Sequence, residues 1–316
     1  MRWLVTGGCG FIGRSLIHRL LADPQNELRL LDNFTVGTPA DVEALVGNEL
    51  ARIDFVEGDV RDDIATSRAA DGRDVIVHLA ANTGVGPSVA DPRMDCVTNV
   101  VGTLNMLETC RKHGIKRLVF ASSGATIGEG EPPLHEEMPT HPSSPYGASK
   151  LAGEAYCSAY SRSYGIETVA LRFGNCYGPS SGHKNSVVAK FIREALAGET
   201  WKIYGDGAQT RDFIYVDDVV EALHRAATVE GVGGELFQIA TSRETTVAEL
   251  AQTLAAVLRS RGTVVSEPTH VSPLAGEVRR NYSDTSKALE RLGWTARTPL
   301  ADGLERTVDW FLARQK

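Results

Sequence analysis

Residues 1–13 read MRWLVTGGCGFIG. An apolar run, Arg2–Thr6, ends at a turn that holds Gly7, Gly10 and Gly13, and an amphipathic run at 11–22 follows. Glycines at this spacing between a strand and a helix are typical of a turn that receives a dinucleotide pyrophosphate. Gly7 allows the tight turn, Gly10 lets the backbone approach the phosphates, and Gly13 lets the helix pack close to the sheet. The opening of the chain therefore predicts an α/β fold.

The rest of the first half continues the same alternation of apolar and amphipathic runs. We predict strands at 28–31, 53–57, 75–79, 118–121 and 168–173, and helices around 39–46, 95–112 and 147–164. Nearly continuous apolar strands that alternate with helices indicate a doubly wound parallel sheet, the Rossmann arrangement, covered on both faces. Residues 1–172 would form this dinucleotide-binding domain, with 213–240 returning to it.

The regular alternation of strands and helices ends in the second half, after the loop Gly178-Pro179-Ser180-Ser181-Gly182. Helices are predicted at 187–197, 217–227, 247–260 and 301–312, with a strand at 201–204. We expect residues 173–212 and 241–316 to form a smaller α/β lobe that binds the substrate at the open end of the sheet.

Composition and charge exclude several classes of protein. The 316 residues are 42% hydrophobic and include 33 basic and 40 acidic residues, for a net charge of −7. Such a surface does not attract nucleic acid or anionic lipid over its whole extent. No apolar run approaches the roughly 18 residues of a membrane span. The five scattered cysteines form no CxxC pair, and the first thirteen residues resemble a strand and a glycine turn rather than a secretory signal. We therefore expect a cytoplasmic protein without disulfides or zinc.

Asp32 lies nineteen residues beyond Gly13, at the end of the second predicted strand. A carboxylate in this place accepts hydrogen bonds from both ribose hydroxyls of NAD and repels the 2′-phosphate of NADP. The alternative role, a cap for a helix or turn, ranks lower because the glycine turn stands in the matching strand–turn–helix setting. NAD is therefore the predicted cofactor.

Tyr146-Gly147-Ala148-Ser149-Lys150 is the second chemical signal. Ser144 and Pro145 predict a helix start, which puts Tyr146 and Lys150 on one helix face at i and i+4. An ammonium group beside a phenol favours the phenolate, and so does an oxidised nicotinamide, so Tyr146 becomes a candidate base. The alternative is a chance surface pair, which the dinucleotide turn upstream makes the weaker interpretation.

These motifs and others occur in a fixed order along the chain: TGGCGFIG at 6–13, Asp32, Gly58-Asp59-Val60, His78-Leu79-Ala80-Ala81, Asn99 with Gly102-Thr103, Ser122-Ser123, Tyr146 with Lys150, and Arg211-Asp212-Phe213-Ile214-Tyr215-Val216-Asp217-Asp218. Together they resemble an extended short-chain dehydrogenase/reductase of the NAD-dependent epimerase/dehydratase family, most similar to its UDP-glucose 4-epimerases. The resemblance covers essentially the whole chain.

The resemblance implies a set of cofactor residues. Asp59 would hold the adenine amino group, and Ala80 and Ala81 would line the cofactor near its nicotinamide ribose. The full set is Gly7, Gly10, Phe11, Ile12, Gly13, Asp32, Asn33, Asp59, Val60, Leu79, Ala80, Ala81, Asn99, Tyr146 and Lys150.

The resemblance also implies a nucleotide-sugar site. Lys202 and Tyr204 would pack the uracil, and Arg211 would bind the diphosphate, unless it pairs with Asp212 or Asp217. The substrate residues implied are Val85, Ser123, Gly124, Thr126, Tyr146, Asn175, Asn185, Ser186, Val187, Lys202, Tyr204, Arg211, Glu277 and Asn281. Relatives often form homodimers through two helices that correspond to 95–112 and 147–164.

Two departures from the family pattern concern substrate binding. Many relatives have an Arg-Pro-Gly motif with a diphosphate arginine where this chain reads Leu-Ala-Gly-Glu at 274–277, and Arg279 and Arg280 are candidate substitutes. Glu277 would still reach a ribose hydroxyl. Gly124 stands where the family has the hydroxyl that binds the sugar O4. That catalytic hydroxyl would come from Ser122, Ser123 or Thr126, with Ser123 preferred and Thr126 next.

Within the family, the residues after the strand-end serines separate the reactions. The Asp-Glu pair of a 4,6-dehydratase, the Glu of a decarboxylase and the Cys of a 3,5-epimerase would lie at 124–125, where this chain has Gly124 and Ala125. The resemblance then implies a 4-epimerase, in which Tyr146 takes the O4 proton, hydride passes from sugar C4 to NAD, and the 4-keto sugar turns over before hydride returns.

The substrate implied is UDP-glucose or UDP-galactose, and alternatives stay open. UDP-glucuronate would need a cation near Gly182, where Lys184 is available but is interpreted as a solvated loop lysine. Asn281 is smaller than the Tyr of strict UDP-glucose enzymes and keeps UDP-N-acetylhexosamines open. A non-catalytic NAD sensor ranks low because Tyr146 and Lys150 are both present. His135-Glu136-Glu137 is interpreted as structural, and no metal is predicted.

Overall fold

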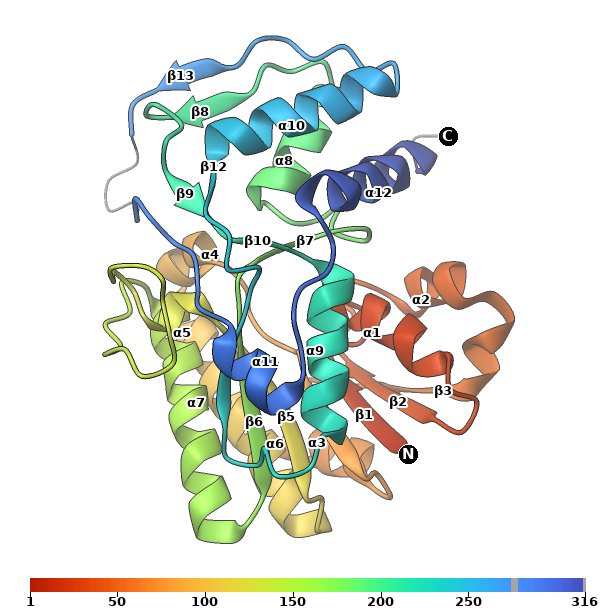
Figure 1. The fold of residues 1–316 in the computed structure, drawn as a ribbon. Helices are drawn as coiled ribbons and strands as arrows, with labels where there is room; N and C mark the ends of the chain where they lie inside the picture. The colour runs from red at the N-terminus through yellow and green to blue at the C-terminus, as the bar shows by residue number, and fades with distance from the viewer. Residues whose placement is uncertain (274–277, 315–316) are drawn as a thin grey trace.

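The computed structural model describes residues 1–273 and 278–314. A seven-stranded sheet lies at its centre, in the order β11-β6-β5-β4-β1-β2-β3, and all its neighbouring strands run parallel (Figure 1). The strands are β1 (Arg2–Thr6), β2 (Glu27–Asp32), β3 (Ile53–Glu57), β4 (Val75–His78), β5 (Arg117–Ser123), β6 (Glu167–Phe173) and β11 (Leu236–Ile239). The strand order reverses direction between β1 and β4, and ligands of doubly wound sheets bind at this point. The predicted Rossmann fold is confirmed.

Side chains of the sheet alternate between two hydrophobic cores. Trp3 and Val5 of β1 join the core under α1 and α9, whereas Leu4 joins the core under α3, α6 and α7. This alternation follows from the period of two along a strand. The helices are α1 (Phe11–Leu21), α2 (Pro39–Val46) and α9 (Val216–Thr228) on the first face, and α3 (Asp63–Ala70), α6 (Gly102–His113) and α7 (Pro145–Tyr164) on the second.

Several local predictions differ from the structure. The predicted helix 95–112 begins earlier as α5 (Pro92–Cys96), passes through a π-helical segment, Val97–Val101, and continues as α6. The sequence also gave no sign of α3, whose apolar positions are mostly alanines and carry little periodic signal, although Asp62 caps its first turn. Further short helices are α4 (Val85–Ala90) and two 3₁₀ turns, Gly47–Arg52 and Gly124–Thr126.

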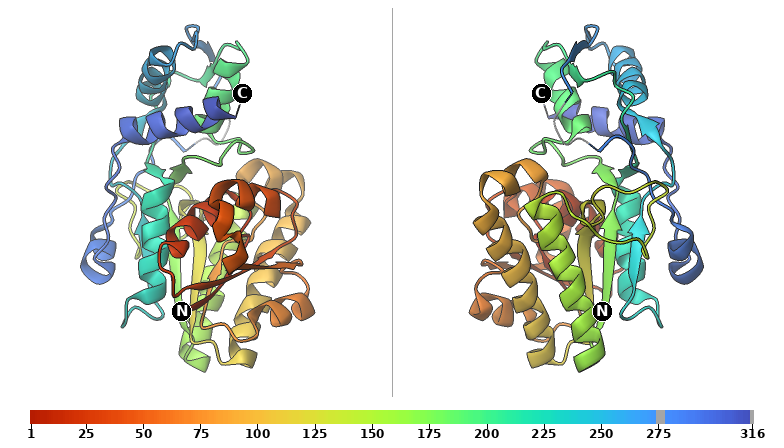
Figure 2. Two further views of the ribbon diagram at one scale, coloured as in Figure 1. Left: turned by 90° about the vertical axis from the view of Figure 1, so that its right-hand side faces the viewer. Right: turned by 90° about the vertical axis from the view of Figure 1, so that its left-hand side faces the viewer.

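The C-terminal lobe lies at the carboxyl ends of the sheet strands. The N-terminus, where β1 begins, lies at the opposite end of the sheet (Figures 1 and 2). Its core includes Trp201, whose ring stacks on Phe191 at 4.8 Å and whose Nε1 donates to the Phe191 carbonyl. The lobe contains α8 (Val187–Leu196), α10 (Val247–Ser260), α12 (Leu300–Ala313), and the paired strands β8 (Lys202–Tyr204) with β13 (Thr269–Val271) and β9 (Thr210–Arg211) with β12 (Thr245–Thr246).

Two segments connect the lobe to the sheet. β7 (Asn175–Tyr177) pairs with β10 (Phe213–Tyr215) in a separate two-stranded sheet, and α9 and β11 then return to the main domain. One element lies elsewhere than its predicted domain: α11 (Ser286–Leu292), assigned from the sequence to the lobe, packs against β11 and α9. Its apolar Ala288 and Leu292 are buried there, which local sequence does not reveal.

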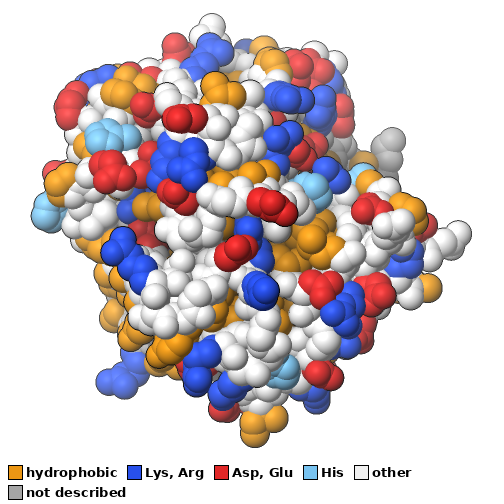
Figure 3. Space-filling view, turned by 60° about the horizontal axis from the view of Figure 1, so that its bottom comes forward, with side chains coloured by type: hydrophobic (Ala, Val, Ile, Leu, Met, Phe, Trp, Pro, Cys, Tyr) orange, Lys and Arg blue, Asp and Glu red, His pale blue; other side chains and the backbone are white. Residues whose placement is uncertain are grey.

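The face of the molecule turned away from the lobe carries basic and acidic side chains close to one another, with apolar groups between them (Figure 3). No helix within the described residues is long and apolar enough to cross a membrane.

Candidate active site

The glycine turn after β1 is closely packed against the next strand of the sheet. Gly7 has φ +67°, and a Cβ there would lie 2.8 Å from the Ala80 nitrogen. A Cβ on Gly13 would lie 2.5 Å from the carbonyl oxygens of Gly7 and Gly8. At Gly10 a Cβ would approach only the Gly7 oxygen, at 3.2 Å, so its outer side is open. The start of α1 therefore offers free backbone N–H groups to an anion such as a pyrophosphate.

Asp32 caps the glycine turn, which is the alternative role weighed from the sequence. Its Oδ2 accepts from the Cys9 nitrogen and its Oδ1 from the Phe34 nitrogen, each at 2.9 Å, so it ties the glycine turn to the end of β2. Each carboxylate oxygen keeps a second acceptor site for a ribose hydroxyl. Burial raises the pKa of Asp32, and the backbone hydrogen bonds lower it.

Asp59 lies beside this edge, held by Asn33 and Arg61. Asn33 Nδ2 donates to Asp59 at 2.9 Å, and the Arg61 guanidinium binds the carboxylate with two contacts of 2.8 Å. The Arg61 hydrogen bonds hold the pKa of Asp59 well below its usual range. Val60 is buried next to it, under Gly102. The negative charge of the Asp59 carboxylate makes it an acceptor for an amino group such as that of adenine.

A buried polar network joins β1, β4 and the π-helical segment. Thr6 Oγ1 contacts His78 Nδ1 at 2.7 Å and accepts from the Ala80 nitrogen at 3.1 Å. His78 Nε2 contacts Thr103 Oγ1 at 3.2 Å, and Thr103 donates to the Asn99 carbonyl at 2.6 Å. Burial lowers the pKa of His78 to about 3, so its ring stays neutral in these contacts. The network fixes Leu79, Ala80 and Ala81 in place beside the glycine turn.

Tyr146 and Lys150 are side by side at the start of α7. The predicted cap is confirmed, because Ser144 Oγ accepts from the Gly147 nitrogen at 3.1 Å. Lys150 Nζ donates to the Ala121 carbonyl at 2.8 Å and lies 6.0 Å from the centre of the Tyr146 ring. The first turn of α7 thereby presents both groups at the carboxyl end of β5.

In the protein without its cofactor, burial dominates the pKa values of this pair. Burial raises the pKa of Tyr146 to about 12, and a hydrogen bond from Ser123 opposes the rise. Burial lowers the pKa of Lys150 to about 8. In the protein alone, desolvation therefore keeps the phenol protonated. Further positive charge beside the phenol is needed, and an oxidised nicotinamide carries one.

The structure separates the three candidate hydroxyls. Ser123 faces Tyr146, and its Oγ also accepts from the Ala125 nitrogen at 3.2 Å. Ser122 points to the other side of β5 and is bonded to Glu154 within a buried cluster. Thr126 is fully buried and donates to the Ser123 carbonyl at 3.0 Å. Ser122 and Thr126 therefore have structural contacts, and Gly124 begins the 3₁₀ turn Gly124–Thr126.

The loop before α8 carries the next group of predicted substrate residues. Arg193 donates to the carbonyls of Gly182 and Lys184, at 2.8 and 2.6 Å, and to Asn185 Oδ1 at 3.1 Å. Ser186 and Val187 begin α8, and no described residue bonds the buried Ser186 hydroxyl. Asn175 lies exposed on β7 and Val85 exposed at the start of α4. A buried hydroxyl without a partner is expected where a ligand supplies one.

Lys184 contradicts its interpretation as a solvated loop lysine. Its Nζ lies 6.0 Å from the centre of the Phe11 ring, at the glycine turn, and burial lowers its pKa. No carboxylate among the described residues lies within ion-pair distance of it. The loop, held by Arg193 and by a 2.9 Å bond from Arg14 to the Ser180 carbonyl, turns this ammonium inward.

The nucleotide-binding residues predicted for the lobe lie on β8, β9 and the segment after 277. Arg211 Nη1 donates to the Thr210 and Val278 carbonyls, while Asp212 is engaged by Thr241. Lys202 and Tyr204 both lie on β8, and the Asn281 nitrogen donates to Thr210 Oγ1 at 3.3 Å. Glu277 and the 274–276 segment lie outside the described residues.

The two arginines proposed as substitutes for the absent diphosphate arginine are in different states. Arg280 is bound to Glu244 and Glu131 at 2.8 Å each, which occupies its guanidinium. Arg279 contacts Asp206 at 3.5 Å and its side chain is 73% exposed.

Glu136, from the segment His135-Glu136-Glu137, accepts a hydrogen bond from the Gln238 nitrogen at 2.7 Å. This bond connects the segment to β11.

Sequence reasoning missed Asp95 and Ser149, which contact Asn99 beneath α7. Asn99 Nδ2 lies 3.0 Å from Asp95 Oδ1 and 3.0 Å from Ser149 Oγ. A signal was present, since Asp95 precedes Asn99 by one helical turn and so shares its face.

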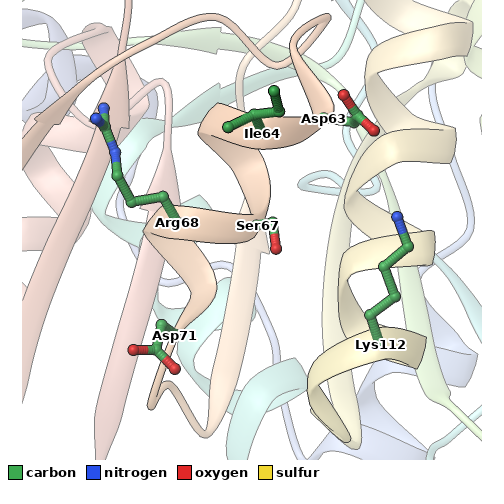
Figure 4. Close-up of a pocket in the computed structure, with 6 residues that line it drawn as sticks. All are labelled: Asp63, Ile64, Ser67, Arg68, Asp71 and Lys112. Carbon is green, nitrogen blue, oxygen red and sulfur yellow. The ribbon is translucent and has the colours of Figure 1, made fainter.

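The surface hollow of Figure 4 lies between α3 and α6 and contains none of the predicted site residues. In it Arg68 points away from Lys112.

The NAD dependent epimerase/dehydratase family model matches residues 3–240. The chain belongs to this family. A UDP-glucose 4-epimerase of Mycolicibacterium smegmatis is 39% identical over 98% of each chain. Curated relatives also include dTDP-glucose 4,6-dehydratases.

Solved structures of similar proteins extend this relation to the fold. UDP-glucose 4-epimerase of Thermotoga maritima, with UDP-glucose, has a TM-score of 0.91 at 35% identity and matches 100% of both chains. UDP-glucuronic acid 4-epimerase of Bacillus cereus, with UDP-glucuronic acid and NAD, has a TM-score of 0.90 at 29% identity over 99% of this chain and 100% of the other. NAD is the cofactor of this epimerase/dehydratase, and the glycine turn with Asp32 fits it.

Proposed function

We propose that this NAD-dependent epimerase/dehydratase interconverts the C4 epimers of a UDP-sugar, UDP-glucose and UDP-galactose first among them. The observation that carries the proposal is the carboxyl end of β5, where Ser123 faces Tyr146 and the adjoining turn, Gly124–Thr126, offers no carboxylic acid. A dehydratase needs an acid there to expel the C6 hydroxyl. Without one, proton transfer at O4 is the chemistry that these side chains support.

In the proposed reaction, Tyr146, Ser123 and Lys150 have different roles at the sugar O4. Tyr146 accepts the O4 proton and later returns it, and Ser123 donates a hydrogen bond that stabilises the phenolate. Lys150, fixed on the Ala121 carbonyl, keeps its ammonium beside the phenol. Bound NAD supplies a hydride acceptor in the first half of the cycle and a hydride donor in the second. Because the cofactor is regenerated in each cycle, it can stay bound.

The test is incubation of the purified protein, without added NAD, with UDP-glucose, UDP-galactose, UDP-N-acetylglucosamine and UDP-glucuronate separately. Proton NMR of the sugar C4 position resolves each product mixture. We expect one pair of C4 epimers to equilibrate, which names the substrate and shows that cofactor is retained. If no pair moves even after NAD is supplied, the proposal of a UDP-sugar 4-epimerase fails. Other nucleotide sugars are then assayed, and if none of them is converted the non-catalytic NAD sensor replaces it.

A specific observation favours UDP-glucuronate as the second candidate. The inward-turned Lys184 ammonium lies near Phe11 without a carboxylate partner in the described part of the chain. It is half-buried, and a partly desolvated cation is stabilised by an anion. A sugar carboxylate would supply it. In the same assay Lys184→Met should abolish turnover of UDP-glucuronate and leave UDP-glucose turnover within a few-fold. Equal effects on both substrates would assign Lys184 to the shared diphosphate instead. The N-acetyl substrates, kept open by Asn281, are decided by the third arm of the assay.

We also propose that the protein forms a homodimer through the π-helical segment with α6 and through α7. Both present apolar groups to solvent: Val101 is 39% exposed and Tyr156 38% exposed. Ala155 and Ala159, next to Tyr156 on α7, are exposed as well. We expect sedimentation velocity to give twice the chain mass for the wild type and a single-chain mass for Tyr156→Glu. A wild-type sample that sediments as one chain would reject the dimer.

A further inference from the structure

Asp95 is a buried carboxylate to which the proposed chemistry gives no role. It lies in the short helix α5, which packs against α7, and is 1% exposed. Its Oδ1 accepts from Asn99 Nδ2 at 3.0 Å, and no described residue bonds its buried Oδ2. A buried carboxylate oxygen without a donor is costly, so it is expected only where its charge or orientation is used.

Asn99 connects Asp95 to both halves of the site. Its Oδ1 accepts from the Asn82 nitrogen at 2.8 Å, and its Nδ2 lies 3.0 Å from the Asn82 carbonyl and from Ser149 Oγ. Ser149 in turn donates to the Tyr146 carbonyl at 3.0 Å. The π-helical segment shifts the register of the helix so that Asn99 points inward, as such segments do at functional sites. Asp95 therefore fixes the orientation of the Asn99 amide. This amide holds the backbone at Asn82, after β4, and the first turn of α7.

The charge of Asp95 also reaches the two groups that exchange or stabilise the proton. It raises the pKa of Tyr146, and it raises the pKa of Lys150 against the larger effect of burial. In a water-poor interior such fields are weakly screened. The other titratable groups around this pair are Glu154 and Cys157 of α7, Lys184 of the loop before α8, and His78 of β4.

We propose that Asp95 is a positioning residue that fixes the Asn99 amide beneath α7 and sets the electrostatic field at the Tyr146 and Lys150 side chains. Only one part of this proposal rests on the proposed function, namely that the field serves proton transfer at the sugar O4. By keeping protons on both groups, Asp95 confines formation of the phenolate to the state in which the positive charge of oxidised cofactor is present. Its removal makes both groups more acidic.

The direct test is titration of the NAD-bound protein without any sugar. Tyrosine labelled with ¹³C at Cζ reports each phenol, and Tyr146→Phe identifies the signal of Tyr146. In Asp95→Asn we expect the pKa of Tyr146 to fall by about one unit, because a nearby negative charge is removed. Asp95→Ser should shift it in the same direction. Asp91→Asn is the matched control, since Asp91 caps the same helix through the Met94 nitrogen and is exposed, and asparagine caps equally well.

A pH–rate profile separates the positioning role from a purely structural one. With Asp95→Asn both pKa values fall, so the whole profile should move toward acid, whereas structural damage lowers the rate equally at every pH. An unchanged Tyr146 titration in both Asp95 variants, or an equal shift in Asp91→Asn, would overturn the proposal. Because the titration needs no turnover, it stands or fails independently of the epimerase reaction.

Discussion

Tyr146→Phe is expected to lower epimerisation by roughly 100- to 10,000-fold, the contribution typical of a positioned general base. The phenol is half-buried, faces Ser123 and lies beside Lys150, and in the proposed reaction it takes the proton of the sugar O4. The backbone of the first turn is held by Ser144 and by Ser88, which accepts from the Tyr146 nitrogen at 3.1 Å. The fold and the NAD content should therefore stay unchanged.

The measurement is the NMR epimerisation assay together with cofactor content after release by denaturation. Tyr156→Phe, on the same helix but 38% exposed, is the control and should retain wild-type turnover. Turnover of Tyr146→Phe at the wild-type rate would remove Tyr146 from the mechanism. Loss of both turnover and NAD would show that the residue holds the cofactor.

The largest effect on stability is expected from Arg172→Met. Arg172 of β6 binds Glu154 of α7 with contacts of 2.7 and 2.8 Å, and both side chains are almost completely buried. Removing one partner leaves Glu154 charged and buried beneath Ser122, which should cost about 3–5 kcal/mol. The midpoint of urea unfolding should fall accordingly, while the slope of the transition stays the same.

Two controls define this result. Arg2→Met removes a guanidinium from another strand of the same sheet, where Arg2 binds the exposed Asp74, and the midpoint should barely change. The double variant Arg172→Met with Glu154→Leu should recover much of the loss, because it removes the unpaired charge together with its partner. A single variant as stable as the wild type would mean that Glu154 takes up a proton or reaches solvent.

Short-range patterns in the chain were enough to predict the fold and the cofactor. The glycine turn, Asp32 and the pair of Tyr146 and Lys150 each depend on contacts within one strand–turn–helix unit or one helical turn. The conformations involved follow from local sterics and hydrogen bonding, as with the positive φ of Gly7 and the cap at Ser144. The Rossmann sheet follows from the apolar periodicity in the same way.

Only the tertiary structure decided which polar groups lie beside Tyr146 and the glycine turn. Ser122 and Ser123 are neighbours in sequence, and the pleat of β5 sends one to Glu154 and the other to Tyr146. Lys184 looks like a loop lysine until Arg193 and Arg14 close its loop onto Phe11. Asp95 acquires its effect on Tyr146 because α5 packs against α7. Burial and charge–charge distance set these pKa values. Both depend on residues far apart along the chain, such as Phe11 and Lys184, and are absent from any local pattern.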